Sequence, residues 1–338
     1  MLMDSLGVLY SYKESQEPRN PMSVIPAELH INYWKIPVKN AVYNRFLDIG
    51  LLIENSTSQI DTVYFYFPFL VTKDDIEDLG AKLTDSDMFC TFFNGDYTIV
   101  NVPNSQVYHE IKSPLEDERN SFWLYELSPS NFEMKALNKG VMVCVKIKSL
   151  PEIQSIQNEE QRDEEDKHGL CIRFRIKNMS DKGYFYNESV SNDFFQSAFS
   201  KTEMMDLRIN EKREFDRSVD EDIKSNKVFF RFSKFHFFFV GSSENEAVTG
   251  NVNYDDSRLI DIDKWKKYLG DVVVKSNKLV AYHWSKKKRG EDGFKKCSVF
   301  LRTVYSSHSW LKISKYVLVV LLLGIIASAI VSTIFYFL

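Results

Sequence analysis

The stretch YVLVVLLLGIIASAIVSTIFYFL, residues 316–338, contains no charged side chain and divides the chain into two parts of different character. As an α-helix it would measure roughly 34 Å at about 1.5 Å per residue, which exceeds a hydrocarbon core of about 30 Å. Aromatic side chains mark both ends, with Trp310 and Tyr316 before and Phe335 and Tyr336 after, as is typical of membrane interfaces. The stretch predicts one transmembrane helix; the alternative is a hydrophobic helix buried against a partner.

Small residues recur inside this stretch. Gly324, Ser328 and Ser332 follow one another every four residues, so they share one side of the predicted helix. Small side chains allow membrane helices to approach closely and to hydrogen-bond. This pattern predicts a homo-oligomer that forms through the helix, although the same spacing can arise by chance in a monomeric anchor.

Basic residues precede the apolar stretch. Between residues 286 and 315 there are nine Lys or Arg and two acidic residues, a local net charge of +7 in a chain whose total is −4. Lysine and arginine beside a membrane helix attract anionic lipids, and they also set topology. We therefore predict membrane-surface contacts for Lys286, Lys287, Lys288, Arg289, Lys295, Lys296, Lys312 and Lys315. The alternative is a solvated loop next to an ordinary positive flank.

The orientation of the chain follows from the same charges. The first twenty residues lack the basic and apolar regions of a signal peptide, so we expect a tail-anchored protein whose bulk faces the cytoplasm. The four cysteines are far apart in sequence and form no metal-binding motif, which fits a reducing compartment.

Upstream, the sequence is typical of β-structure. Apolar and polar residues alternate over 47–53, 63–67, 141–148 and 170–176, as in half-buried strands. The aromatic run VFFRFSKFHFFFV, residues 228–240, changes the phase of its polar residues, which predicts a β-bulge. We expect hairpins that join 47–53 to 63–67 and 279–284 to 298–305, the second with a charged tip.

Short helices are predicted at three places. Thr72 and Asp75 form a capping pattern at the start of residues 73–83, and Asp263 precedes a possible helix over 264–269. A further helix is expected near 191–199.

The predicted organisation is mainly β, with antiparallel sandwich-like domains, a few short helices and one C-terminal transmembrane helix. Residues 151–169 are densely acidic, and all nine prolines lie at or before Pro151, which suggests a boundary there. One hairpin with a long tip is the alternative. The predicted segments are an extended arm (1–27), a β-rich domain (28–150), an acidic linker or loop (151–169), a second β-rich domain with the basic hairpin (170–306), a juxtamembrane segment (307–315) and the membrane helix (316–338).

No catalytic or nucleotide-binding motif occurs, and no cofactor or metal is predicted. Four aspartates at 255, 256, 261 and 263 could offer oxygen ligands to a cation, but a turn followed by a helix cap explains them equally well. We interpret His236 as an ordinary residue of a sheet, and His283 is equally ambiguous.

These features predict a membrane-tethered interaction or scaffold module whose partners are anionic lipids and an unidentified protein. A membrane-perturbing effector that acts through clustered helices is one alternative. A hydrolase whose site is assembled only in the folded protein is another. Nucleic acid is not expected as a partner, because aromatic residues are scarce among the clustered cations.

Overall fold

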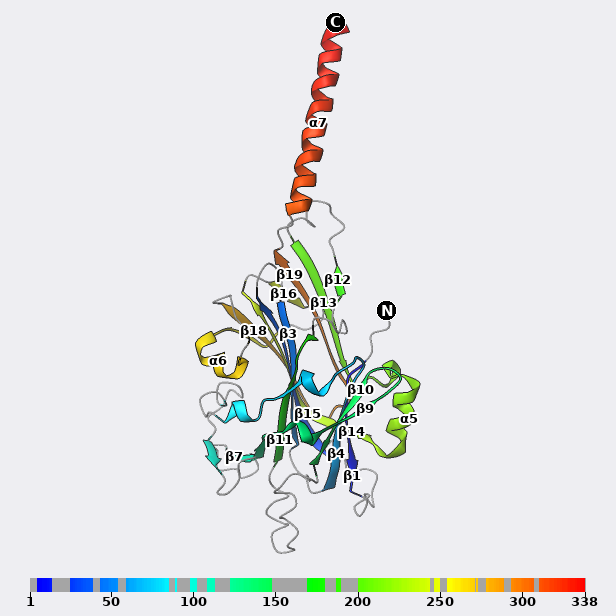
Figure 1. Cartoon of the computed structure of the whole chain (residues 1–338), viewed down its shortest axis with the longest axis vertical. Coiled ribbons are helices and arrows are strands. Elements are labelled where there is room, and N and C mark those ends of the chain that lie inside the picture. Colours follow the sequence, from blue (N-terminus) through cyan, green and yellow to red (C-terminus); the bar gives the residue numbers. More distant parts are fainter. Residues whose placement is uncertain are drawn as a thin grey trace, which may run out of the picture.

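Strands dominate the structure, a computed structural model, and a single long helix ends the chain (Figure 1). The described residues are 5–13, 25–38, 43–53, 59–84, 89, 98–101, 108–112, 122–147, 169–179, 187–189, 200–243, 246–249, 254–270, 272, 278–288, 293–306 and 310–337. Their strands form three sheets of ten, five and four strands. The predicted mainly β class with a few short helices is confirmed.

The ten-stranded sheet contains strands from almost the whole length of the chain. Nine strands run in the order β17, β18, β15, β2, β3, β11, β8, β7 and β6, and β5 pairs beside β11. In chain order the bounds are β2 Pro26–Pro37, β3 Tyr43–Ile53, β5 Ile76–Asp78, β6 Thr98–Asn101, β7 Tyr108–Lys112, β8 Phe122–Tyr125, β11 Gly169–Ile176, β15 Arg231–Ser242, β17 Asp256–Ile260 and β18 Leu279–Lys287. The β2–β15 and β8–β11 pairs are parallel and the others antiparallel, so the expected antiparallel pairing fails at two places.

The five-stranded sheet packs its inner face on the ten-stranded sheet. Its order is β14 (Val228–Phe229), β1 (Gly7–Tyr12), β4 (Ile60–Phe67), β10 (Val141–Lys146) and β9 (Phe132–Ala136). Buried aromatic and branched side chains from both sheets form one core between them, and the ring centroids of Phe65 and Phe174 lie 4.9 Å apart. Alternating apolar residues on both sheets create this interface.

Helices cover parts of the two outer faces. Helix α5 (Arg217–Asn226) begins after its cap Asp216 and buries Val219 on the five-stranded sheet. Helix α6 (Ile262–Leu269) buries Tyr268 on the ten-stranded sheet, and its cap is Asp261 rather than the predicted Asp263. The structured part upstream of the long helix therefore has helix, sheet, sheet and helix layers.

The four-stranded sheet joins this body to the long helix. Its order is β12 (Asn187–Ser189), β13 (Ser200–Ile209), β19 (Cys297–Ser306) and β16 (Glu246–Thr249). Strand β13 pairs with β19 along its whole length. The buried carboxylate of Glu203 on β13 accepts hydrogen bonds from Lys35 on β2 and, at 3.1 Å, from Arg45 on β3. This ion group ties the small sheet to the large one.

Helix α7 (Trp310–Phe337) follows β19 and extends away from the sheets (Figure 1). Its apolar segment, Ile313–Phe337, has a mean hydropathy of 2.8, and none of its residues is buried. By length and composition it is the one described helix that could cross a membrane. A helix buried in this chain's own core is excluded for these residues.

The sheets do not follow the predicted division into two β-rich domains. Strands from 28–150 and from 170–306 share the ten-stranded sheet, and β14 from the second half lies beside β1. Strand β1 also shows that the predicted arm contains a buried strand paired on both sides. The acidic segment is outside the described residues except for Gly169, which begins β11.

Both predicted hairpins are wrong, because their strands belong to different sheets. Strand β3 lies in the ten-stranded sheet and β4 in the five-stranded sheet, while β18 and β19 are divided in the same way. Strands β10 and β11 also lie in different sheets, which rules out the alternative of one hairpin with a long tip.

The predicted helix over 73–83 is also wrong. It is replaced by the 3-10 turns η3 (Lys73–Asp75) and η4 (Ala81–Leu83) on either side of β5. The capping contact is nevertheless present, since Asp75 accepts hydrogen bonds from Thr72. The predicted bulge is confirmed between Phe232 and Lys234. The expected helix near 191–199 lies outside the described residues.

Candidate functional site

Polar side chains gather on the outer face of the ten-stranded sheet, on β2, β15 and β18. Because side chains alternate along a strand, Glu28 and His30 lie opposite the core residues Leu29 and Ile31. The parallel register places His30 directly beside His236. His283 is diagonal to His236 on the next strand. Three histidines from distant parts of the sequence thereby meet in one row.

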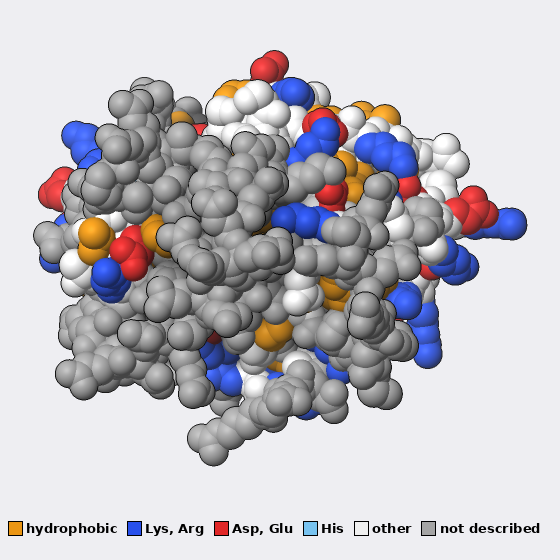
Figure 2. All heavy atoms as spheres, turned by 90° about the horizontal axis from the view of Figure 1, so that it is seen from below, with side chains coloured by type: hydrophobic (Ala, Val, Ile, Leu, Met, Phe, Trp, Pro, Cys, Tyr) orange, Lys and Arg blue, Asp and Glu red, His pale blue; other side chains and the backbone are white. Residues whose placement is uncertain are grey.

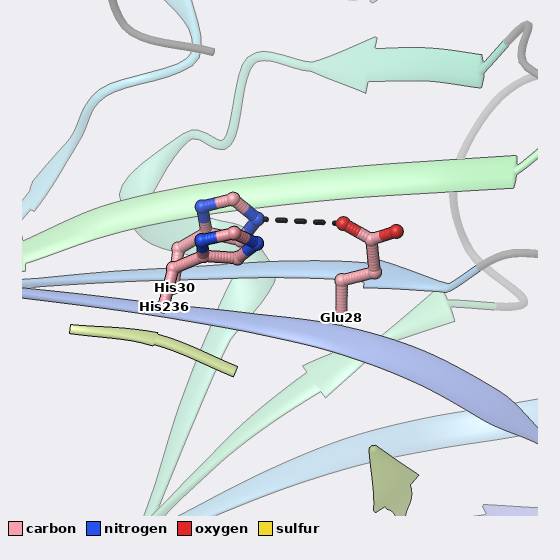
Figure 3. Close-up of side chains that lie close together, drawn as sticks. All are labelled: Glu28, His30 and His236. Carbon is pink, nitrogen blue, oxygen red and sulfur yellow. Dashed lines mark ion pairs between the residues drawn. The ribbon is translucent and has the colours of Figure 1, made fainter. Parts of the chain in front are cut away.

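We call Glu28, His30, His236 and His283 the histidine group. The rings of His30 and His236 are stacked with centroids 4.7 Å apart, and those of His236 and His283 are 5.2 Å apart. Nδ1 of His236 and Nε2 of His283 share a hydrogen bond of 3.0 Å. Figure 3 shows that His30 and His236 each direct a nitrogen toward the Glu28 carboxylate, with 3.7 Å between His30 Nε2 and Glu28 Oε2.

The histidine group favours neutral imidazoles and an ionised carboxylate. Burial lowers the pKa of His236 to about 3, and the neighbouring His30 and His283 lower it further. Burial also lowers the pKa values of His30 and His283. Burial opposes the ionisation of Glu28, but its contacts with His30 and Lys234 outweigh this effect and hold its pKa at about 2.

Glu28 has different partners on its two oxygens. Oε1 accepts a hydrogen bond from the Lys234 ammonium, while Oε2 faces His30. One ligand atom from each of Glu28, His30 and His236 can be chosen so that all three lie within 4.8 Å of one another. Among the described residues this is the group whose nitrogen and oxygen atoms could hold a metal ion.

A second polar group, the Asp48 group, occupies the same sheet face nearer to α6. The Asp48 carboxylate accepts hydrogen bonds from Trp34 at 2.8 Å, from Tyr268 at 2.8 Å and from Arg175 at 2.7 and 3.1 Å. The Arg175 guanidinium also lies 4.0 Å from the centre of the Phe46 ring. All of these side chains are buried, so the group is a closed structural network.

Between the two groups, β3 carries a glycine. A Cβ atom at Gly50 would lie 2.4 Å from Nη1 of Arg173 and 3.5 Å from His30 Cβ. The buried Arg173 side chain occupies this space and donates from Nε to Tyr268 at 3.1 Å. The missing side chain at Gly50 thus allows an arginine to lie across the sheet.

The predicted lipid-contacting cations fall into two separate places. Strand β19 has ten residues, about 30 Å at 3.3 Å per residue, and it separates the 286–296 region from α7. Phe294 pairs with Phe232 near the start of β15, which confirms that this region lies at the end of β19 opposite the helix. Lys315 lies on α7 and is exposed, and Lys312 lies on the same helix.

Several cations of the 286–296 region have local partners. Lys296 donates to Glu211 at 2.8 Å, Lys288 donates to the Gly293 carbonyl at 3.1 Å, and the Lys286 ammonium lies 4.8 Å from the Phe294 ring centre. Lys287 and Lys295 are exposed, and Arg289 is outside the described residues. A groove of about 440 Å³ next to these residues is lined by both signs of charge, from Arg208, Glu211, Arg213, Glu214, Lys286 and Lys296.

The end of the molecule opposite α7 also shows mixed charge. Figure 2 views this end, where the described Lys, Arg, Asp and Glu side chains are interspersed. Among the residues drawn in colour there, neither sign of charge forms a large separate area. The structure therefore does not gather the predicted cations into one lipid-binding surface.

The predicted helix-packing residues are exposed on α7. Gly324, Ser328 and Ser332 lie on one side of the helix, and a Cβ atom at Gly324 would meet nothing within 4 Å. Residues four apart on a helix are offset by about 40°, so the three remain on one face. That face is open to a second helix.

The four aspartates have structural roles in three cases. Asp255 accepts hydrogen bonds from the Ser285 amide at 2.6 Å and its hydroxyl at 2.7 Å. Asp256 pairs with Arg258 at 2.8 Å, and Asp261 caps α6. The interpretation as a turn and a helix cap accounts for these contacts.

Sequence reasoning did not select Glu28 and His30, and it interpreted His236 as an ordinary sheet residue. The sequence pattern that could have identified these residues is weak. Glu28 and His30 alternate with apolar residues, as Lys234 and His236 do, so both pairs are expected on outer faces. The parallel pairing that brings them together has no local signature. No protein-family model matches this chain, and a search of curated proteins finds no match to it.

Proposed function

We propose that this protein is a single-pass, tail-anchored membrane protein that holds a β-rich interaction domain at a bilayer surface. The observation that carries the proposal is α7. An exposed segment with a mean hydropathy of 2.8 is unfavourable in water, and a helix satisfies its own backbone hydrogen bonds in lipid. The domain upstream has its own continuous core.

We further propose that the domain lies on the cytoplasmic side. Lys312 and Lys315 are at the N-terminal end of α7, where positive charge favours retention in the cytoplasm. The three described cysteines, Cys144, Cys171 and Cys297, are free and buried, which suits a reducing compartment. The same two lysines are the part of the predicted cation set that would contact anionic headgroups in this arrangement.

We propose that a protein partner binds at the exposed edge of the ten-stranded sheet. Strand β17 lies at one end of the described strand order, and Leu259 on it is 66% exposed. Unpaired strand edges can accept an extended segment of another protein. The charged pair Asp256–Arg258 on the same strand limits unspecific edge pairing.

Fractionation of cells tests the membrane proposal. The full chain should remain with membranes after a carbonate wash. Residues 1–309 should be soluble and folded, because no described side chain of α7 belongs to the core. The matched control replaces 316–338 by an unrelated apolar helix of equal length, which should restore membrane retention. Residues 1–309 remaining in washed membranes would contradict a single anchor.

Protease treatment of sealed vesicles tests the orientation. Vesicles with the cytoplasmic face outward should lose the β domain to the protease, and vesicles of the opposite orientation should protect it. Protection in the first preparation would place the domain on the other side.

Self-association through α7 is proposed from the exposed stripe of small residues. Replacing Gly324 and Ser328 by leucine keeps the helix hydrophobic but prevents close approach. Crosslinked oligomers in membranes should decrease while carbonate-resistant retention is unchanged. Equal crosslinking by the variant and the parent would show that the stripe does not mediate contact.

A further inference from the structure

We propose that Glu28, His30 and His236 form a binding site for a divalent transition-metal ion of the zinc type, with His283 orienting His236. Two imidazole nitrogens and one carboxylate oxygen come from adjacent strands of a sheet. The site lies on the outer face of the ten-stranded sheet and is independent of the membrane helix.

The geometry is close to what such an ion requires. Tetrahedral zinc takes nitrogen or oxygen ligands at about 2.0–2.2 Å, so two ligand atoms are about 3.4 Å apart. Here His30 Nε2 and Glu28 Oε2 are 3.7 Å apart, and the three ligand atoms lie within 4.8 Å of one another. Binding of one ion through both nitrogens requires the His30 and His236 rings to rotate out of their stacked arrangement, so that their lone pairs converge. A solvent molecule would take the fourth position.

Each proposed ligand has a partner that fixes its orientation. His236 binds through Nε2 because its Nδ1 shares a hydrogen bond with His283, and an N–H on Nδ1 would donate to His283 Nε2. Glu28 keeps one oxygen on Lys234 and leaves the other for the ion. Hydrogen bonds of this kind, on the atoms that do not bind metal, are typical of protein metal sites.

The chemistry of the ligand set indicates the class of ion. Imidazole suits zinc, copper, nickel and iron, whereas calcium and magnesium prefer several oxygen ligands. His30 and His236 each direct one ring nitrogen toward Glu28, and a neutral imidazole nitrogen is the form that binds metal. The Glu28 carboxylate supplies the negative charge. Lys234 and Arg173 oppose a cation, so we expect selectivity for ions that bind nitrogen strongly.

Metal titration of the full chain in detergent, without a polyhistidine tag and after treatment with a chelator, tests the site. Cobalt(II) should bind with one ion per chain and give the intense visible absorption of a tetrahedral complex, and zinc should displace it. His30→Gln and His236→Gln should each reduce the affinity by more than about 100-fold, and His283→Gln by about 10- to 100-fold.

The chain offers a matched control. His109 lies 2.9 Å from Glu126 on the same sheet but has no third ligand beside it among the described residues. His109→Gln should leave cobalt affinity and stoichiometry unchanged. If a histidine variant does not fold, as judged by circular dichroism, Glu28→Gln removes the charged ligand at nearly constant shape and should lower the affinity in the same way.

Loss of the tetrahedral spectrum in the folded ligand variants, with retention in His109→Gln, supports the site. A wild-type protein that gives only the weak spectrum of octahedral cobalt would overturn it. So would folded Glu28, His30 or His236 variants that bind cobalt as tightly as the wild type.

Discussion

The histidine group and the Asp48 group lie on the same face of one sheet, yet they differ in how their hydrogen-bonding capacity is used. Asp48 accepts four hydrogen bonds from three buried side chains, which leaves little capacity for a ligand. Glu28, by contrast, faces imidazoles that are stacked on one another. The fully buried Asp48 network stabilises the fold. The histidine group is only partly buried and is the better candidate for binding.

The largest effect is expected for Asp48→Ala. This change leaves the Arg175 guanidinium buried without its carboxylate, which costs about 3–5 kcal/mol for a broken buried ion pair. Urea denaturation of residues 1–309 would measure the loss. A decrease below about 1 kcal/mol would show that the Asp48 group is not the structural one of the two.

Gly50→Ala should have the next largest effect. The added methyl group would meet the buried Arg173 guanidinium, so the arginine must leave its contact with Tyr268 or the strand must shift. Overpacking of this kind costs about 1–3 kcal/mol. The same denaturation assay applies, and near-UV circular dichroism should report a change around Tyr268. Wild-type stability would show that Arg173 can move freely.

A third carboxylate, that of Asp78, should make the free energy of unfolding depend on pH. Burial raises the pKa of Asp78 to about 6, and the backbone amides that donate to its carboxylate, including that of Ala81, offset this effect only in part. The folded state then binds more protons than the unfolded state between pH 3.8 and 6, so this group's contribution to stability declines as pH rises through that range.

Asp78→Asn should remove that contribution. The difference in unfolding free energy between Asp78→Asn and the parent should change by about 1–2 kcal/mol from pH 4 to pH 7, in favour of the variant at pH 7. Parallel denaturation series at several pH values measure it. A difference independent of pH would mean that Asp78 titrates normally.

The smallest effect is expected for Glu28→Gln in the presence of a chelator. Glu28 is partly buried, its partner Lys234 is 43% exposed, and glutamine keeps the shape of the side chain. We expect a loss of about 1 kcal/mol or less. A loss as large as that of Asp48→Ala would make both groups structural and remove the contrast between them.

Much of the local structure could be predicted from the sequence. Alternation correctly indicated β3, β4, β10 and β11, and the change of phase in residues 228–240 correctly indicated the bulge in β15. These signals are local, because they depend only on which side of a strand each residue occupies.

Strand partners could not be predicted in the same way. Adjacent strands such as β3 and β4 separate into two sheets, while β2 pairs in parallel with β15 from the other half of the chain. Core burial decides such pairings, and many apolar strands are interchangeable in this respect. The candidate site shares this difficulty, since His30 and His236 become neighbours only through the parallel pairing.

The link between β19 and α7 also has a mechanical consequence. Tension between the membrane and a partner bound to the domain would enter through the C-terminal end of β19 and act along that strand. Its antiparallel hydrogen bonds to β13 are perpendicular to this direction. The hydrogen bonds from Ser306 to Cys297 are therefore loaded in shear and share the force. The strand that connects the domain to its helix is therefore placed to withstand pulling rather than to peel away one bond at a time.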